Sequence, residues 1–240
     1  MPELNLPLKI KIKLEDFCEG LKKIYGDGLI SVTLYGSGAS REFLHKVSNL
    51  NVLVVLASVG LEDLKKSGGL LKKSSVISPL YLDQDYIRNS VDIFPIEFLD
   101  MRENYQVLYG KDVLKDIVVD TRNLRFQCEQ ELKSKLLGLR QAYLRAQKDA
   151  AALKGILIRA FISVLHLTRN VLRLKGENPP YKKEELLARL AAEFPINGPA
   201  WERILAVKQG RQKSSAKDTL ELFGTFTGDL EKIVGIVDKM

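Results

Sequence analysis

The chain has 240 residues, of which 45% are hydrophobic and 28% are charged, a mixture typical of soluble globular proteins. It lacks the ~18 to 20 uninterrupted apolar residues of a membrane-spanning helix and the apolar block of a secretory signal. We therefore expect a cytoplasmic protein without a membrane partner. Its two cysteines, Cys18 and Cys128, are far apart, which excludes a disulfide framework and predicts that both are buried apolar residues.

The net charge of +7 is spread unevenly along the chain. Residues 1–116 carry 15 basic and 16 acidic side chains, so the second half holds all of the excess positive charge. Such asymmetry indicates a surface that meets nucleic acid or an acidic partner. Solvated helix faces give the same count, and we favour this second interpretation.

The first half alternates helical and strand-like segments. Leu14, Phe17, Leu21 and Ile24 recur at intervals of three and four residues, which predicts a helix over 14–25. Apolar runs of strand length follow, separated by glycine turns and polar segments. The four predicted strands span residues 29–35, 51–59, 74–82 and 93–99, with a short helix over 83–89 between the last two.

The second half has the spacing of helices throughout. Apolar residues recur at helical intervals over several turns, and a glycine and the Asn-Pro-Pro turn at 178–180 end the most apolar helix. The predicted helices cover about 120–143, 151–175, 182–193, 199–209 and 215–239, the last interrupted by Gly224 and Gly228. The predicted fold class is α/β (α+β), with a mixed sheet in residues 1–117 and an all-α helical bundle in residues 118–240.

One segment, YGSGASREFLHKVSNLNVLVVL, carries the most information about function. It places Gly36 and Ser37 directly after a strand, and Asn49 and Asn51 at the opening of the next strand. This layout resembles the nucleotidyltransferase superfamily over about residues 10–116. The helical half matches that superfamily in architecture only.

The resemblance implies a donor nucleotide site. In the superfamily the Gly-Ser turn holds the phosphates, here Gly36 and Ser37, and Arg41 lies where many members carry an Arg-Gly-Glu run. Two aspartates open the following strand and bind Mg²⁺, and a third carboxylate comes from a later strand. Alternate strand residues share a face, so paired carboxylates there can hold a dication beside a triphosphate.

This chain departs from the superfamily at the metal-binding positions. Asn49 and Asn51 replace the aspartates, and a neutral amide is a weaker ligand for Mg²⁺ than a carboxylate. For the third position we prefer Glu97 over Asp92, since Glu97 lies inside a predicted strand. We assign no metal ligand, and expect Mg²⁺ as a cofactor only if the site is still active, with help from residues such as Glu42.

Each part of the motif also has a structural explanation. A Gly-Ser pair after a strand is often an ordinary tight turn. The two asparagines can open a strand and hydrogen-bond the local backbone. The residues in this order and spacing favour the fold without favouring catalysis.

The most apolar helix contains a second candidate site. Arg159 and His166 lie seven residues apart, so their side chains share a helix face. The pair resembles the Arg and His of HEPN ribonucleases, which implies cleavage beside a 2′-hydroxyl. We favour a buried histidine satisfied by a neighbour, and expect His45, the other histidine, to be exposed.

Three functions remain open from the sequence. We favour a catalytically degenerate nucleotidyltransferase-like protein that keeps nucleotide binding or a regulatory role. The alternatives are an active metal-dependent nucleotidyltransferase with an unknown acceptor, and a helical module that binds or cleaves nucleic acid. The expected partners are an NTP, nucleic acid through the basic second half, and a second copy of the chain. The expected basic surface carries Arg122, Arg125, Lys133 and Arg140 and would face the Gly-Ser turn across a cleft.

Overall fold

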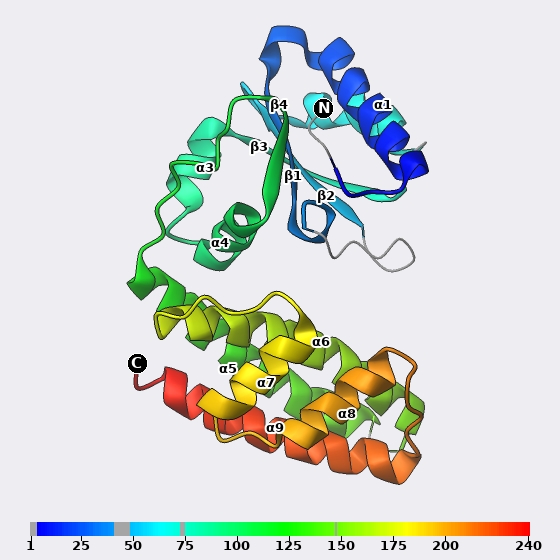
Figure 1. Cartoon of the computed structure of the whole chain (residues 1–240), viewed down its shortest axis with the longest axis vertical. Coiled ribbons are helices and arrows are strands. Elements are labelled where there is room, and N and C mark those ends of the chain that lie inside the picture. The colour runs from blue at the N-terminus through cyan, green and yellow to red at the C-terminus, as the bar shows by residue number, and fades with distance from the viewer. Residues whose placement is uncertain (1–3, 41–48, 73–74, 147) are drawn as a thin grey trace. The chain divides into compact units, whose positions relative to one another are not determined.

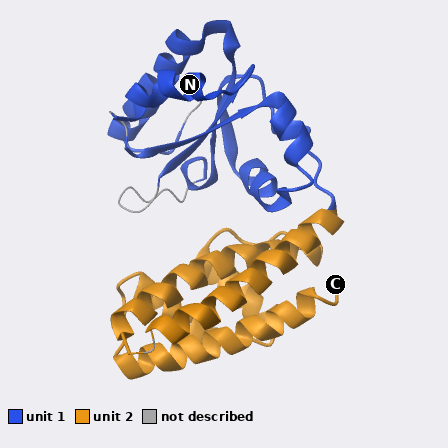
Figure 2. Cartoon of the chain, turned by 180° about the vertical axis from the view of Figure 1, so that it is seen from behind, with its two compact units in different colours: residues 1–120 blue, residues 121–240 orange. Residues whose placement is uncertain are grey.

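The computed structural model describes residues 4–40, 49–72, 75–146 and 148–240. The chain divides into two compact units, residues 1–120 and 121–240 (Figure 2). The first unit is a four-stranded sheet with helices on both faces, and the second is built of helices (Figure 1). The predicted α+β class with a helical second half is confirmed.

The first unit contains the mixed sheet that the sequence predicts. Strands lie in the order β3-β2-β1-β4, with β1 antiparallel to β2 and β4, and β2 parallel to β3. The helices and strands of this unit are α1 (Leu8–Tyr25), β1 (Leu29–Tyr35), β2 (Leu50–Leu56), α2 (Leu61–Lys72), β3 (Ile77–Asp83), α3 (Gln84–Ser90), α4 (Pro95–Glu103) and β4 (Tyr105–Gly110), with short 3-10 turns η1 (Gly26–Gly28) and η2 (Gly36–Gly38) on either side of β1.

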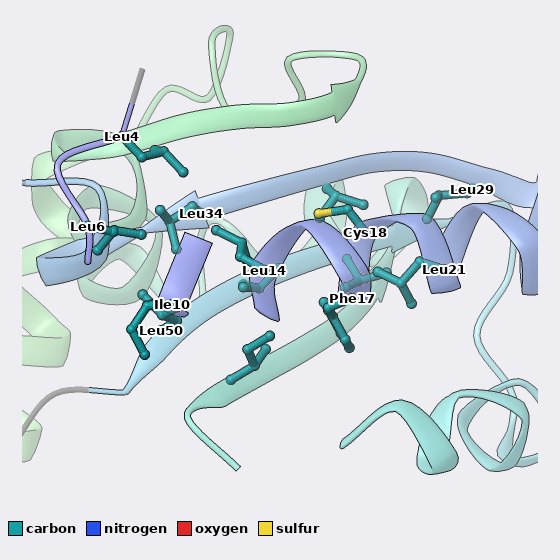
Figure 3. Packing of buried hydrophobic residues seen from close by; sticks show 14 of the residues in the cluster. Leu4, Leu6, Ile10, Leu14, Phe17, Cys18, Leu21, Leu29, Leu34 and Leu50 are labelled. Carbon is teal, nitrogen blue, oxygen red and sulfur yellow. The ribbon is translucent and has the colours of Figure 1, made fainter. Parts of the chain in front are cut away.

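Helix α1 covers one face of the sheet. Its Leu14 and Leu21 are fully buried and pack with Leu34 of β1 and Leu50 of β2 in one apolar cluster (Figure 3). Cys18 lies in the same cluster, and burial raises the pKa of its thiol to about 12. Both cysteines are buried, as predicted.

Helices α3 and α4 cover the opposite face. Leu53 and Val55 of β2 pack there with Ile87 of α3 and with Phe98 and Met101 of α4. Because side chains alternate along a strand, odd-numbered residues of β2 point to this face and even-numbered residues point to α1. The opening of β2 therefore presents its polar odd-numbered residues on the side of α4.

The predicted strand over 93–99 is wrong, because these residues begin helix α4. Pro95 stands at the first helical position, where its missing N–H is not needed and its fixed φ suits a helix. Pro95, Phe98 and Met101 are buried at intervals of three, which is helical spacing rather than the alternation of a strand. The fourth strand is instead β4, which pairs with β1 through residues such as Tyr105 opposite Tyr35.

The second unit packs five helices around an aromatic centre. Phe161 contacts Trp201 and Phe226 with ring centroids 5.7 Å and 6.0 Å away. Buried Asp229 accepts hydrogen bonds from the Trp201 Nε1 (3.1 Å) and from the Asn197 backbone N–H (2.7 Å). The helices are α5 (Thr121–Ala146), α6 (Ala150–Leu174), α7 (Lys183–Glu193), α8 (Gly198–Lys208) and α9 (Ala216–Val237).

Helix α9 runs without a break through Gly224 and Gly228, so the predicted interruption is wrong. A glycine inside a helix costs roughly 1 kcal/mol relative to alanine, which tertiary packing can offset. Buried Phe226, Leu230 and Ile233 provide that packing on one face of α9.

Helix α6 is long and apolar enough to cross a membrane by length and composition alone. In the structure it packs along α5 and also contacts α7, α8 and α9. Its residues Leu157, Phe161 and Val164 are buried in this unit. Packing within the bundle therefore accounts for its apolar character.

Candidate functional site

The Gly-Ser turn leaves the sheet where β1 ends. Gly36 has φ +69°, in the left-handed region where residues with a Cβ are strained. Its N–H donates to the Asn104 carbonyl (2.8 Å), and its own carbonyl accepts from the N–H groups of Ala39 (3.0 Å) and Ser40 (3.1 Å). A Cβ added at Gly38 would lie 2.9 Å from Leu50 Cδ2. The turn is thus held tightly against the start of β2.

Ser37 presents its hydroxyl without using it for the fold. The side chain is half-buried, and its Oγ makes no hydrogen bond to the residues that the structure describes. Only the Ser37 carbonyl is engaged, as the acceptor of the Ser40 hydroxyl at 3.3 Å. The predicted phosphate-binding hydroxyl is therefore available to a ligand.

Asn51 lies beside this turn. It stands opposite Tyr35 in the β1–β2 ladder, and Tyr35 directly precedes Gly36 in the chain. Its Nδ2 is 3.5 Å from the position that a Cβ would take at Gly36. Asn51 is half-buried, and Asn49, which directly precedes β2, is exposed. The structure brings Gly36, Ser37, Asn49 and Asn51 to one end of the sheet.

The side chains of Asn49 and Asn51 form no hydrogen bonds to the described backbone at the start of β2. Across the described residues, neither side-chain amide has a hydrogen-bond partner. The interpretation that they serve the local backbone is therefore not supported. An amide that forms no bond within the fold keeps one acceptor and two donors for a ligand.

Glu97 is not on a strand, contrary to the prediction. It is an exposed residue in the first turn of α4, and Asp92 is an exposed residue in the turn before that helix. Helix α4 contacts η2, and its C-cap residue Asn104 accepts the Gly36 N–H, whereas Glu97 lies in the first turn at the other end of the helix. The strand neighbour of Asn51 is instead Ser78, which pairs with it across the parallel strands β2 and β3.

Sequence reasoning missed Ser78. It is exposed, it lies on β3 beside Asn51, and its side chain forms no hydrogen bond to the described part of the chain. The register of β3 decides which residue lies beside Asn51, and that register follows from pairing with β2 rather than from a local pattern. A serine in a strand with Pro79 carries no sequence signal for a site.

The described site residues are neutral at the two positions where the resemblance implies metal-binding aspartates, and the neighbour Ser78 is neutral too. Asn49, Asn51 and Ser78 offer amide and hydroxyl groups, and Mg²⁺ strongly prefers carboxylates and phosphates. Among the residues with a described structure, there is no group of three or more His, Cys, Asp or Glu side chains that could hold a metal. These residues do not fit a two-metal centre. Beside them, burial raises the pKa of Tyr35, so that phenol adds no charge.

Several predicted residues lie outside the described ranges or have other roles. Arg41, Glu42 and His45 fall outside the described residues. Three of the basic residues expected to face the turn form ion pairs inside the second unit: Arg125 with Glu129 (2.8 Å), Lys133 with Glu129 (2.5 Å) and Asp238 (2.6 Å), and Arg140 with Glu231 (2.5 Å). These pairs neutralise part of the charge that α5 would offer to nucleic acid.

The expectation of a buried His166 is wrong. His166 and Arg159 are both exposed on α6, and their spacing of two turns puts them on one face. The buried polar residues of this helix include Thr168 and Asn170, which follow His166 in the chain. The Thr168 hydroxyl donates to the Leu165 carbonyl (3.1 Å), and the Asn170 amide donates to the His166 carbonyl (3.2 Å). Those two side chains serve the helix itself.

Comparison with solved structures identifies the fold. The spectinomycin adenyltransferase of Enterococcus faecialis, solved with ATP and spectinomycin, superposes with a TM-score of 0.59 at 16% sequence identity. The match covers 92% of this chain and 99% of that chain. No family model and no curated protein matches the sequence. The chain therefore has a nucleotidyltransferase-like α+β fold followed by a helical domain.

Proposed function

We propose that this protein binds a nucleotide at the end of the sheet without transferring it, in a regulatory role. The observation that carries the proposal is the pairing of Asn51, which replaces an expected aspartate, with Ser78, so that two neutral side chains lie side by side at the opening of β2. The groups that would bind phosphate are present, since Gly36 forms the turn and the Ser37 hydroxyl makes no hydrogen bond to the described residues. Among the described residues, these groups favour phosphate binding over metal-assisted transfer.

The ligand class follows from the fold and the turn. The adenyltransferase that shares this fold was solved with ATP, which supports an NTP as the ligand here. Phosphate oxygens would accept hydrogen bonds from Ser37 and from the amides of Asn49 and Asn51. Arg41 is a predicted positive neighbour of those phosphates.

Titration calorimetry with ATP, GTP, CTP and UTP tests this proposal. We expect at least one nucleotide to bind, and we expect Ser37→Ala to weaken it. If none of the four nucleotides binds to the folded protein, the proposal is wrong and the fold serves another ligand or a partner protein.

The alternative of an active nucleotidyltransferase needs a carboxylate set from other residues. Glu97 and the residues outside the described ranges, such as Glu42, are its candidates. Release of pyrophosphate from ATP with spectinomycin as the offered acceptor, abolished by EDTA, would establish this alternative. We expect pyrophosphate release at the level of a protein-free blank.

One observation keeps the ribonuclease alternative open. Arg159 and His166 are both exposed on α6, where a substrate could reach them. Cleavage of RNA that is lost in His166→Ala and kept in Ser37→Ala would assign that activity to the helical unit. A homodimer also stays a prediction, which sedimentation velocity can check.

A further inference from the structure

The replacement of aspartate by asparagine changes how phosphate can be held. A carboxylate only accepts hydrogen bonds and repels phosphate, so it needs a cation between the two groups. An amide has two N–H donors and no charge, and it can bond a phosphate oxygen directly. The same shape of side chain therefore supports two different modes of binding.

The geometry of Asn51 suits direct binding. Its Nδ2 lies 3.5 Å from the Cβ position of Gly36, so the side-chain amide lies beside the turn and can present its N–H groups there by rotation about χ2. The next residue of that turn is Ser37, whose hydroxyl is unused by the described residues. A hydroxyl and an amide that form no hydrogen bond to the described residues therefore lie at the Gly-Ser turn, where the resemblance implies that phosphates bind.

Two further donors border this position. Asn49 directly precedes Leu50, the first residue of β2, and Ser78 is the neighbour of Asn51 on β3. Both are exposed, and neither uses its side chain in a hydrogen bond to the described residues. Hydrogen bonds from neutral donors to an ionised phosphate are among the stronger kind.

We infer that this site binds the nucleotide's phosphates directly through amide and hydroxyl donors, independently of Mg²⁺. The inference rests on the proposed nucleotide binding and names its mode. Since Mg²⁺ occupies the same phosphate oxygens in solution, it competes with the amides and does not bridge to them. ATP therefore binds equally well or better when the metal is removed.

Calorimetric titration of the full chain with ATP, in EDTA and in excess Mg²⁺, tests the inference. We expect the affinity in Mg²⁺ to be no higher than in EDTA. Asn51→Asp should weaken binding in EDTA about tenfold or more, because a donor is lost and a negative charge now faces phosphate. Added Mg²⁺ should recover much of that loss, since the carboxylate introduced by this substitution is a ligand for the metal.

Asn89→Asp is the matched control, because it adds the same charge at an exposed position on α3. Asn49→Asp is the second test variant, since Asn49 is exposed and its substitution does not disturb the packing of β2. We expect Asn49→Asp to weaken ATP binding in EDTA and to recover affinity in Mg²⁺, as Asn51→Asp does. We expect the Asn89→Asp control to bind ATP as the unchanged protein does.

The outcomes separate the inference from the proposed function. ATP binding that Mg²⁺ strengthens tenfold or more overturns direct binding and leaves nucleotide binding in place. Binding in EDTA that is as strong in Asn51→Asp and Asn49→Asp as in Asn89→Asp also overturns it. If ATP binds under neither condition, the proposed function fails and the inference fails with it.

Discussion

Asn51 on β2 and Ser78 on β3 are directly paired neighbours on parallel strands, at the end of the sheet where the Gly-Ser turn begins. The resemblance to nucleotidyltransferases implies metal-binding aspartates at the opening of β2. Here both partners are neutral, so one acidic residue elsewhere cannot restore the charge of the pair. The pairing places a second neutral side chain beside Asn51, which the sequence alone does not reveal.

Removing the Ser37 hydroxyl should weaken nucleotide binding without affecting the fold. We expect Ser37→Ala to lower the affinity for the bound nucleotide about tenfold, because a hydrogen bond to a charged phosphate is lost. The hydroxyl has no partner among the described residues, so the melting temperature should stay unchanged. Calorimetry and thermal unfolding measure the two effects. Ser58→Ala, at an exposed serine beyond the other end of β2, is the control.

Gly110 should tolerate no side chain. It has φ +76°, and a Cβ there would lie 2.0 Å from the Ile30 carbonyl oxygen. Left-handed strain and forced backbone movement together should lower the free energy of unfolding of Gly110→Ala by roughly 3 kcal/mol or more. Gly28→Ala is the control, since nothing lies within 4 Å of that Cβ position. Equal stability of the two variants in denaturant titration would show that β4 does not approach β1 this closely.

Asp229 should be a main stabilising residue of the helical unit. Asp229→Ala leaves the buried Trp201 Nε1 and the Asn197 N–H without their acceptor. We expect the free energy of unfolding to fall by roughly 3 kcal/mol, with lower Trp201 fluorescence anisotropy at intermediate denaturant. Asp238→Ala, which removes an exposed ion pair with Lys133, should change stability little. A similar loss in both variants would contradict the role of burial.

Acid should destabilise the helical unit partly through Asp218. The Ser215 backbone N–H, the Ser215 hydroxyl and the Arg203 guanidinium lower the pKa of Asp218 from 3.8 to about 2. A carboxyl group with a lowered folded pKa stabilises the fold above its unfolded pKa and loses that effect as pH falls through its folded value. Unfolding of the unchanged protein should therefore become easier between about pH 4 and pH 2. Asp218→Asn should show a weaker pH dependence over that range, and an identical slope would exclude the α9 cap as a contributor.

Much of the fold could be predicted from the sequence, because its strongest patterns are local. β1 and β2 are nearly continuous apolar runs, and the long helices repeat apolar residues over many turns. The short elements were harder. Helix α2 contains Gly68 and Gly69, which disfavour a helix, and it is held by tertiary contacts such as the Tyr25 hydroxyl on the Asp63 carbonyl at 2.6 Å.

The candidate site could be predicted only in part, because some of its residues follow from local sequence and others from contacts between distant segments. Gly36, Ser37, Asn49 and Asn51 belong to one continuous segment, so their order and spacing are visible in the sequence. The sequence predicts a strand around Glu97 because residues 93–99 are mostly apolar, whereas Phe94 caps a helix that begins at Pro95. Ser78 depends on strand register, which is set by contacts between distant residues.

Hydrogen exchange of the backbone, with and without ATP and in the absence of Mg²⁺, tests the nucleotide site most directly. We predict that ATP slows exchange in peptides covering residues 36–40 and 75–80, because bound phosphates restrain the turn and the start of β3. Exchange in residues 150–174 of the helical unit should stay the same. Unchanged exchange at 36–40 and 75–80 in a protein that binds ATP, or slower exchange confined to 150–174, would contradict nucleotide binding at this end of the sheet.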